Sequence, residues 1–177
     1  MKPAHLIFVV IISVLMGIAI YGFLLPNTSH VERSITISAS PEEIFPHLNN
    51  VKMFDQWSPW MEYDPNVVIQ YSGPEEGVGA YSGWSSEHPK VGHGSRKIIN
   101  SNANQLVEME LDFGDGGKAF IRMELQALAD ITKVTWRFRM PHGNNIYARY
   151  IGLLIEGMVG PDYERGLQNL KQKIEGS

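Results

Sequence analysis

The chain has 177 residues and no cysteine, and it carries a formal net charge of −4 at neutral pH. The absence of cysteine excludes disulfides, thiolate nucleophiles, zinc–thiolate sites and iron–sulfur clusters. An acidic surface repels phosphate backbones, so we predict no nucleic-acid partner. Hydrophobic residues make up 44% of the chain and charged residues 19%, which is typical of a globular domain and not of a disordered segment.

The first apolar segment, Leu6–Leu25, runs for twenty residues without a charge. As a helix it would measure about 30 Å, which matches the hydrocarbon thickness of a bilayer. The alternative is a cleaved signal peptide, but those have apolar cores of roughly 7–15 residues and a small-x-small cleavage site. Here Pro26 directly follows a longer run, so we predict an uncleaved membrane anchor through residues 6–25.

The charges around this segment indicate an orientation. Lys2 and the free α-amino group precede it, whereas Glu32 and Arg33 cancel after it. The positive-inside rule therefore favours a cytoplasmic N-terminus, with the soluble domain of a single-pass protein on the periplasmic or extracellular side. We divide the chain into an anchor and linker at 1–30 and one domain at 31–177, a size that is common for a compact domain.

The soluble domain begins with signals for a strand and then a helix. Val31–Ile37 alternates apolar and polar residues, which predicts a strand. Ser40 follows as an N-cap with Glu43 at the capping-box position, so a short helix is predicted through Leu48. The aromatic, proline-punctuated segment 57–65 is predicted to be a loop.

Strand patterns dominate between residues 67 and 140. Period-two alternation with one polar face predicts an antiparallel sheet that is open to water on one side. A hairpin turn is predicted at Gly114–Gly117. The predicted strands of this region are 67–71, a strand that ends at Trp84, 95–99, 105–113, 119–125 and 134–140.

The C-terminal segment changes its apolar spacing to steps of three and four, which predicts a long amphipathic helix. Pro161 predicts either a restart or a kink within it. This helix is the one long element available to cover the apolar face of the sheet, and a curved sheet wrapped around one helix leaves a cavity. The apolar positions of the helix are Tyr150, Leu154, Met158, Tyr163, Leu167, Leu170 and Ile174.

Five groups of residues occur in order along the domain: Ser40–Phe45, Trp57–Trp60 with Asp64–Pro65, Gly77–Ala80 leading to Trp84, Thr132–Trp136, and Gly160–Leu167 with Leu170–Lys171. Together they resemble the START-like helix-grip superfamily (SRPBCC), and within it the polyketide cyclase/dehydrase and lipid-transport family. The resemblance implies an α+β helix-grip fold, in which a curved antiparallel sheet of about six to seven strands wraps around the long C-terminal helix. The family includes lipid carriers, cyclases, hormone receptors and chaperone activators, so the resemblance leaves the activity open.

The cavity implied by this fold would be lined by aromatic and methionine side chains, which suit an apolar ligand. Each such position could equally belong to the plain core, because cores are built from the same residue types. The predicted ligand-binding residues are Trp60, Tyr81, Trp84, Met109, Phe113, Met123, Trp136, Phe138, Met140 and Tyr150.

No catalytic residue, cofactor or metal site is predicted. The sequence has no Gly-x-Ser-x-Gly elbow, Walker loop or full dinucleotide fingerprint. His88 and His93 straddle a loop but match no zinc-ligand spacing. Arg33 and Glu156 fall among apolar positions, where each is either a cavity acid or base or a residue of the cavity rim. The rim is favoured, because buried charges are rare unless they are paired.

Three functional hypotheses remain. The first is a membrane-tethered module that binds or transfers a hydrophobic small molecule or lipid in the cavity between sheet and helix. The second is an enzyme of the cyclase or dehydratase type that uses the same cavity, and the third is a protein-interaction module that works through its outer face. We favour the first, since burial of an apolar ligand gains about 25 cal/mol per Å² without any charged residue.

Overall fold

The computed structural model describes residues 3–176 and confirms the predicted α+β class. An N-terminal helix, α1 (Pro3–Leu24), is followed by β1 (Thr28–Ile37), which begins three residues before its sequence pattern indicated. Three short helices come next, α2 (Pro41–Asn49), α3 (Val51–Asp55) and α4 (Trp60–Tyr63). The remaining elements are β2 (Val68–Ser72), β3 (Tyr81–Ser85), β4 (His93–Asn102), β5 (Leu106–Asp112), a 3-10 turn at Gly114–Gly116, β6 (Lys118–Leu128), β7 (Ile131–Pro141) and α5 (Ile146–Glu175).

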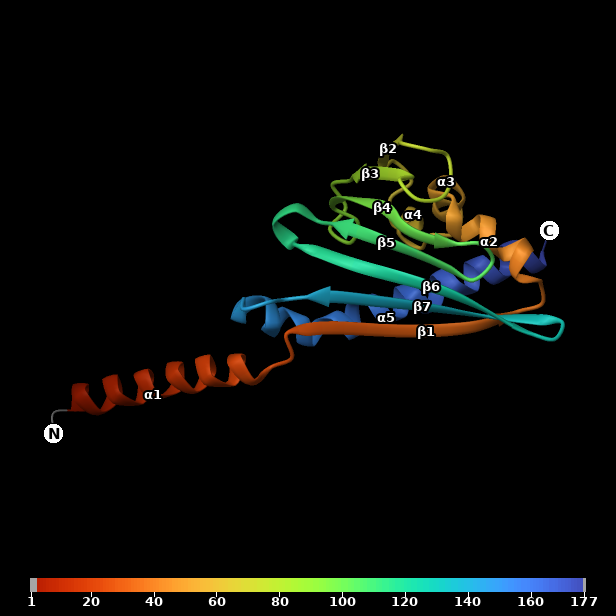
Figure 1. Cartoon of the computed structure of the whole chain (residues 1–177). Coiled ribbons are helices and arrows are strands. Elements are labelled where there is room, and N and C mark those ends of the chain that lie inside the picture. The colour runs from red at the N-terminus through yellow and green to blue at the C-terminus, as the bar shows by residue number, and fades with distance from the viewer. Residues whose placement is uncertain (1–2, 177) are drawn as a thin grey trace.

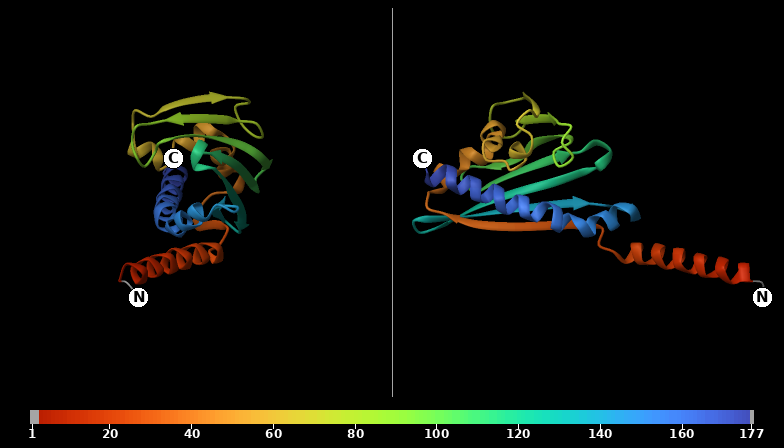
Figure 2. Two further views of the ribbon diagram at one scale, coloured as in Figure 1. Left: turned by 90° about the vertical axis from the view of Figure 1, so that its left-hand side faces the viewer. Right: turned by 180° about the vertical axis from the view of Figure 1, so that it is seen from behind.

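The seven strands of the described chain form one sheet in the order β1-β7-β6-β5-β4-β3-β2, and every neighbouring pair is antiparallel. The first strand therefore pairs with the last, Thr28 opposite Pro141 at one end and Ile37 opposite Thr132 at the other. The sheet curves around α5, which crosses its concave side (Figures 1 and 2). This is the helix-grip arrangement that the sequence resemblance implied.

Local signals explain the short helices that pack at one end of the sheet. The predicted capping box of α2 is present: the Glu43 amide donates to Ser40 Oγ (3.4 Å), and the Ser40 amide donates to Glu43 Oε2 (2.8 Å). The side chain of Asn50 caps α3 in the same way, accepting from the Lys52 and Met53 amides. The segment predicted as a loop contains α4, whose four residues are too few to show a helical period.

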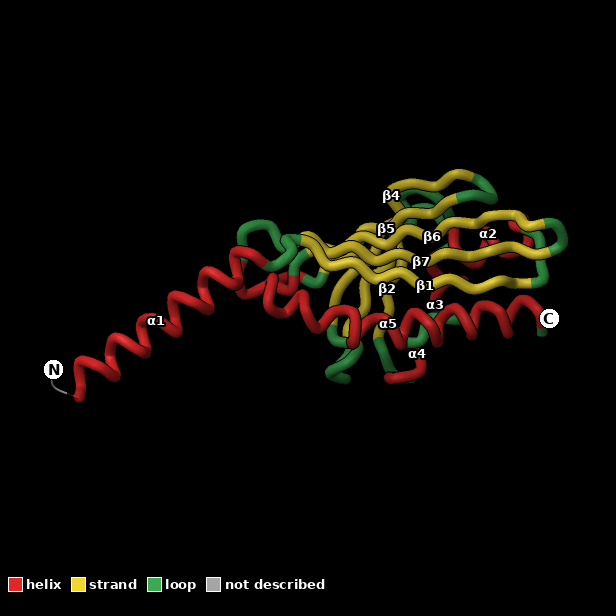
Figure 3. The backbone as a smooth tube through the Cα atoms, turned by 90° about the horizontal axis from the view of Figure 1, so that it is seen from below, coloured by secondary structure: helices red, strands yellow, loops and turns green. Residues whose placement is uncertain are grey.

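The long helix α5 runs without interruption through Pro161, so the predicted restart does not occur. Figure 3 shows this helix passing along the sheet from the α1 side of the domain to the C-terminus. Its second half packs into the core, where Gly166 allows a close approach: a Cβ at this position would lie 2.8 Å from Trp136 Cζ3. The largest fully buried side chains are Trp57, Trp136, Tyr163, Phe54, Ile37, Ile44, Leu48, Ile98, Met109, Met123, Leu170 and Val31.

The helix α1 extends away from the domain (Figure 1) and exposes its apolar side chains along most of its length. Within it, His5–Leu24 is long and apolar enough to cross a membrane, a property that signal sequences share. Its C-terminal turns contact the start of α5, where the Tyr150 hydroxyl donates to the Ile18 carbonyl (2.5 Å) and Arg149 Nη1 to the Phe23 carbonyl (2.9 Å). Gly22 permits this contact, because a Cβ there would lie 2.9 Å from the Tyr150 ring.

Candidate functional site

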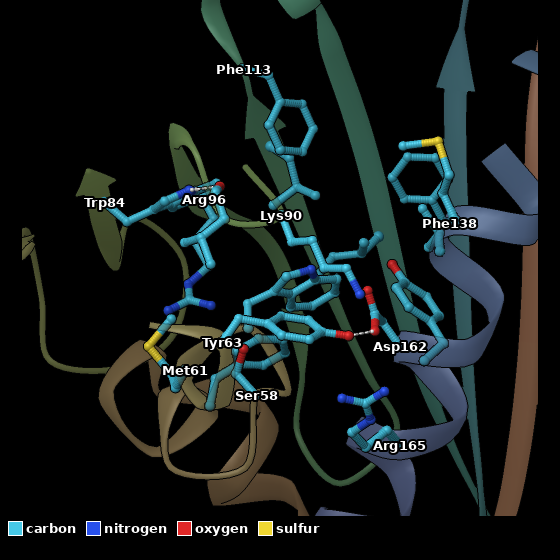
Figure 4. Close-up of a pocket in the computed structure, with 18 of the residues that line it drawn as sticks. Ser58, Met61, Tyr63, Trp84, Lys90, Arg96, Phe113, Phe138, Asp162 and Arg165 are labelled. Carbon is cyan, nitrogen blue, oxygen red and sulfur yellow. Dashed lines mark hydrogen bonds between the residues drawn. The ribbon is translucent and has the colours of Figure 1, made fainter. Parts of the chain in front are cut away.

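A cavity of about 680 Å³ lies between the concave side of the sheet, α5, and the segment that holds α3 and α4. Its volume falls within the range of small-molecule sites. Its opening is marked by lining residues that are also exposed, among them Lys90, Met158, Pro161 and Arg165. Most of the lining is apolar (Figure 4): Phe54, Trp60, Met61, Ile69, Trp84, Val91, Leu111, Phe113, Ile121, Trp136, Phe138, Met140, Ile155, Met158, Val159 and Pro161.

Six of the ten predicted ligand-binding residues lie in this lining: Trp60, Trp84, Phe113, Trp136, Phe138 and Met140. They come from α4, β3, the β5–β6 turn and β7, so residues distant in sequence are brought together. Trp136 is in the middle of them, with its ring edge-to-face with Phe54 (5.7 Å between centroids) and with Trp60 (6.1 Å). Their role as ligand contacts stays a prediction.

The other four predicted residues lie elsewhere. Met109 and Met123 are fully buried in the core, since period-two alternation identifies the inner face of a strand but not where along it a cavity opens. Tyr81 lies one residue from Ser82, which lines the cavity, so it faces the opposite side of the sheet. Tyr150 contacts α1, with its ring 6.2 Å from that of Tyr21.

The wall of the cavity also contains a buried polar group that the sequence analysis missed. Arg96 on β4 forms an ion pair with Asp55 at the end of α3, and both side chains are only 8% exposed. Arg96 Nε donates to Ser82 Oγ (2.8 Å), and its guanidinium carbon lies 4.6 Å from the centre of the Phe54 ring. The sequence could have predicted this position. Arg96 and Ile98 are two residues apart on β4, so the Arg96 side chain points to the same inner face of the sheet as Ile98.

Tyr71 on β2 extends this polar group toward the surface. Its hydroxyl donates to Asp55 Oδ2 at 2.8 Å. Burial, together with the hydrogen bond and the charge of Asp55, raises the pKa of Tyr71 to about 12. The Tyr71 hydroxyl therefore stays protonated and a donor at any physiological pH, which keeps the Asp55 carboxylate hydrogen-bonded on two sides.

A second polar cluster spans the opening of the cavity. The Tyr63 hydroxyl, at the end of α4, donates to Asp162 Oδ1 on α5 at 2.6 Å (Figure 4). The charged groups of Lys90 and Arg165 lie 4.6 Å and 5.3 Å from the centre of the Tyr63 ring. These contacts connect α4, the β3–β4 loop and α5 across the opening, so we call Tyr63, Lys90, Asp162 and Arg165 the latch.

The two charged residues considered as cavity acids or bases lie outside the cavity. Arg33 on β1 pairs with Glu156 (2.7 Å) and Glu164 (2.6 Å) on α5, and the Glu156 side chain is 55% exposed. Neither Arg33 nor Glu156 lines the cavity, so neither its interior nor its rim contains them. Among residues 3–176, no group of three or more histidine, aspartate or glutamate side chains is placed to hold a metal ion.

Comparison with protein families gives one match over most of the chain. The model of the family described as polyketide cyclase/dehydrase and lipid transport matches residues 28–175. The match covers every strand and α5, and it confirms the resemblance seen in the sequence. No curated protein matches the chain.

Solved structures of the same fold cover nearly the whole domain at low sequence identity. The Aha1 dimer from Colwellia psychrerythraea has 18% identity and a TM-score of 0.56 over 82% of this chain and 96% of that one. Ara h 8.0201 has 13% identity and a TM-score of 0.57 over 85% and 99%. Protein SA2116 from Staphylococcus aureus, of unknown function, has 14% identity and a TM-score of 0.60 over 84% and 96%. At these identities the likeness shows the fold alone.

Proposed function

We propose that this chain, which belongs to the polyketide cyclase/dehydrase and lipid-transport family, is a membrane-tethered module that binds or transfers a hydrophobic small molecule or lipid. The ligand would lie in the cavity between the sheet and α5. The observation that carries this proposal is the cavity itself, which is large, open at one side and mostly apolar in its lining. A ligand that buries about 300 Å² of apolar surface there would gain roughly 7 kcal/mol before the costs of association.

An exposed apolar stripe on α5 supports the link between membrane and cavity. Tyr147, Ile151, Leu154 and Met158 lie at steps of four, three and four, so they share one face of the helix, and each is exposed. Tyr147 neighbours the residues that contact α1, and Met158 lines the cavity. Eleven residues of helix separate these two ends, about 16 Å, so the stripe would lead an apolar molecule from the bilayer to the opening.

The tether in this proposal is α1, with the domain held beside it by the α5 contacts. The carbonyl groups at the end of α1 accept hydrogen bonds from Arg149, which satisfies part of the helix C-terminus. The side of the membrane is proposed from the charge bias of the sequence, which places the domain on the periplasmic or extracellular side.

The test is extraction of lipids from the purified full-length protein in phosphatidylcholine nanodiscs, with empty discs as the blank. A variant that fills the cavity, Leu111→Trp, is compared with Leu128→Trp, whose side chain is exposed and outside the cavity. We expect an apolar molecule at near one-to-one stoichiometry in the wild type and Leu128→Trp, and much less in Leu111→Trp. Equal extraction from both variants, or none above the blank from the wild type, would count against the proposal.

A further inference from the structure

The apolar cavity has one wall that is polar and buried. Its four members are Asp55, Ser58, Ser82 and Arg96. As whole residues they are 8%, 3%, 0% and 7% exposed. We call them the polar wall. Buried polar groups in folded proteins normally have hydrogen-bond partners, and each exception calls for a physical reason. Binding of a pure hydrocarbon requires only an apolar lining, and buried polar groups that face it cost free energy. The polar wall therefore favours a ligand that carries a polar group.

Two donors of the polar wall have no partner in the described chain. The hydroxyl of Ser58 is buried and makes no hydrogen bond. The guanidinium of Arg96 uses Nε toward Ser82 and Nη2 toward Asp55 and the Val51 carbonyl, which leaves Nη1 without a bond among residues 3–176. In Figure 4, Ser58 and Arg96 both lie near Met61, Arg96 above it and Ser58 to its right.

The charge of the polar wall selects among possible partners. Arg96 is already neutralised by Asp55, so a ligand carboxylate would bring an uncompensated negative charge into a buried site. A ligand ammonium would find the Asp55 oxygens occupied by Arg96 and Tyr71, and the unpartnered groups there are donors. A neutral acceptor oxygen satisfies the free donors without adding charge.

We propose that the polar wall receives the neutral, oxygen-bearing head of the ligand, a carbonyl or ester group, while the rest of the ligand lies among the aromatic side chains. This inference rests on the proposed function and names its ligand class: an apolar molecule with one neutral carbonyl-type oxygen. Ser58 Oγ and Arg96 Nη1 donate to that oxygen. The aromatic lining around Trp84, Phe113 and Phe138 then encloses the hydrocarbon part.

The experiment uses the full-length protein in phosphatidylcholine nanodiscs and two probes of nearly equal shape. One is 2-dodecanone, and the other is 2-methyl-1-dodecene, in which a methylene group replaces the carbonyl oxygen. Probe bound in excess of empty discs is extracted and quantified by gas chromatography. Because a hydrogen bond contributes about 1 kcal/mol, we expect the wild type to prefer the ketone by at least fivefold.

Ser58→Ala should lower this preference for the ketone about fivefold, while its binding of the alkene stays the same as in the wild type. The matched control is Thr132→Val, which removes a buried hydroxyl that donates to the Ala39 carbonyl and does not line the cavity. It should leave the preference unchanged. The paired variant Asp55→Leu/Arg96→Met keeps the wall neutral and should also reduce the preference.

Four outcomes would overturn the inference. Equal binding of ketone and alkene by the wild type would show an apolar site without a head-group position, and the proposed function would survive. A preference unchanged in Ser58→Ala, or tighter binding of dodecanoate than of 2-dodecanone, would remove the neutral-acceptor assignment. Binding of neither probe above the blank would overturn both the inference and the proposed function.

Discussion

The guanidinium of Arg96 and the carboxylate of Asp55 form a buried ion pair in the wall of the cavity, with Tyr71 as a third member. Removing one partner of such a pair leaves an unpaired buried charge, which typically costs about 3–5 kcal/mol. Arg96→Met should therefore lower the free energy of unfolding by that amount. Replacing both charges, as in Asp55→Leu/Arg96→Met, should restore most of it, since Tyr71 is partly exposed and its hydroxyl can reach water.

Urea unfolding of the full-length protein in nanodiscs, followed by tryptophan fluorescence, measures these differences. The double variant is the control, because it also replaces Arg96 but leaves no unpaired buried charge. If the double variant were as unstable as Arg96→Met, the loss would come from packing around Phe54 and not from charge.

The latch should govern how quickly a ligand leaves. Tyr63→Phe removes the hydrogen bond to Asp162 across the opening while it keeps the aromatic ring. Since one hydrogen bond is worth about 1 kcal/mol, the release rate of a bound apolar probe should rise roughly fivefold. Stopped-flow release of N-phenyl-1-naphthylamine measures it, with Tyr81→Phe as the control, because Tyr81 does not line the cavity and faces the opposite side of the sheet. Equal rates in both variants would show that the latch does not limit release.

The fold could be predicted from the sequence because its signals are local and repeated. Alternation defined the strands of the sheet, and Ser40 with Glu43 marked the start of α2. The family resemblance rested on segments that the family match then covered, residues 28–175. One local detail was wrong, because α4 was too short to show a helical period. Of the two effects predicted for Pro161, the restart of α5 did not occur.

The site could be predicted only in part, because it depends on three-dimensional placement. Alternation put Met109 on an inner face, yet the core fills the space beside it. Tyr81 was assigned to the cavity together with Trp84, although an odd separation along a strand puts two residues on opposite faces. Asp55, Ser58 and Arg96 were missed because they lie on different elements, and only the folded chain brings them to one wall.

The contact of Gly22 with α5 should hold the domain in a fixed position beside the anchor. A side chain at this position would collide with Ile146 and Tyr150, so Gly22→Leu should separate α1 from α5. Gly17→Leu is the matched control, because nothing lies within 4 Å of its Cβ position. With the hydrogen bond from Tyr150 to the Ile18 carbonyl lost, the domain should sample more orientations.

The absence of cysteine makes this prediction straightforward to measure. Spin labels at Ser13→Cys on α1 and Gln168→Cys on α5 report the distance between anchor and domain. We expect a broader distance distribution in Gly22→Leu than in the wild type and an unchanged one in Gly17→Leu. Equal widths in all three proteins would mean that the α1–α5 contact does not orient the domain.

The stability of the domain should fall as the pH drops below 6.5, because two histidines are held neutral in the fold. Burial, with a smaller contribution from the charge of Lys173, lowers the pKa of His47 below its usual 6.5. Burial and the charge of Arg149 lower the pKa of His142 in the same direction. The Nδ1 atom of His47 is buried without a hydrogen-bond partner, so a proton on Nδ1 would have no acceptor for its hydrogen bond.

The direction of this pH dependence follows from whether the folded or the unfolded state binds more protons. In the unfolded chain both histidines take up protons near pH 6.5, whereas in the folded chain they do so only at lower pH. Their contribution to stability is therefore complete above pH 6.5 and is lost as the pH falls through the window below it. Each histidine contributes a slope of at most about 1.4 kcal/mol per pH unit.

Urea unfolding at a series of pH values from 7.5 to 5 measures the slope, and His47→Gln and His142→Gln should each flatten it. A free energy of unfolding that does not change over this range would contradict the prediction, since the carboxylates titrate mainly at lower pH.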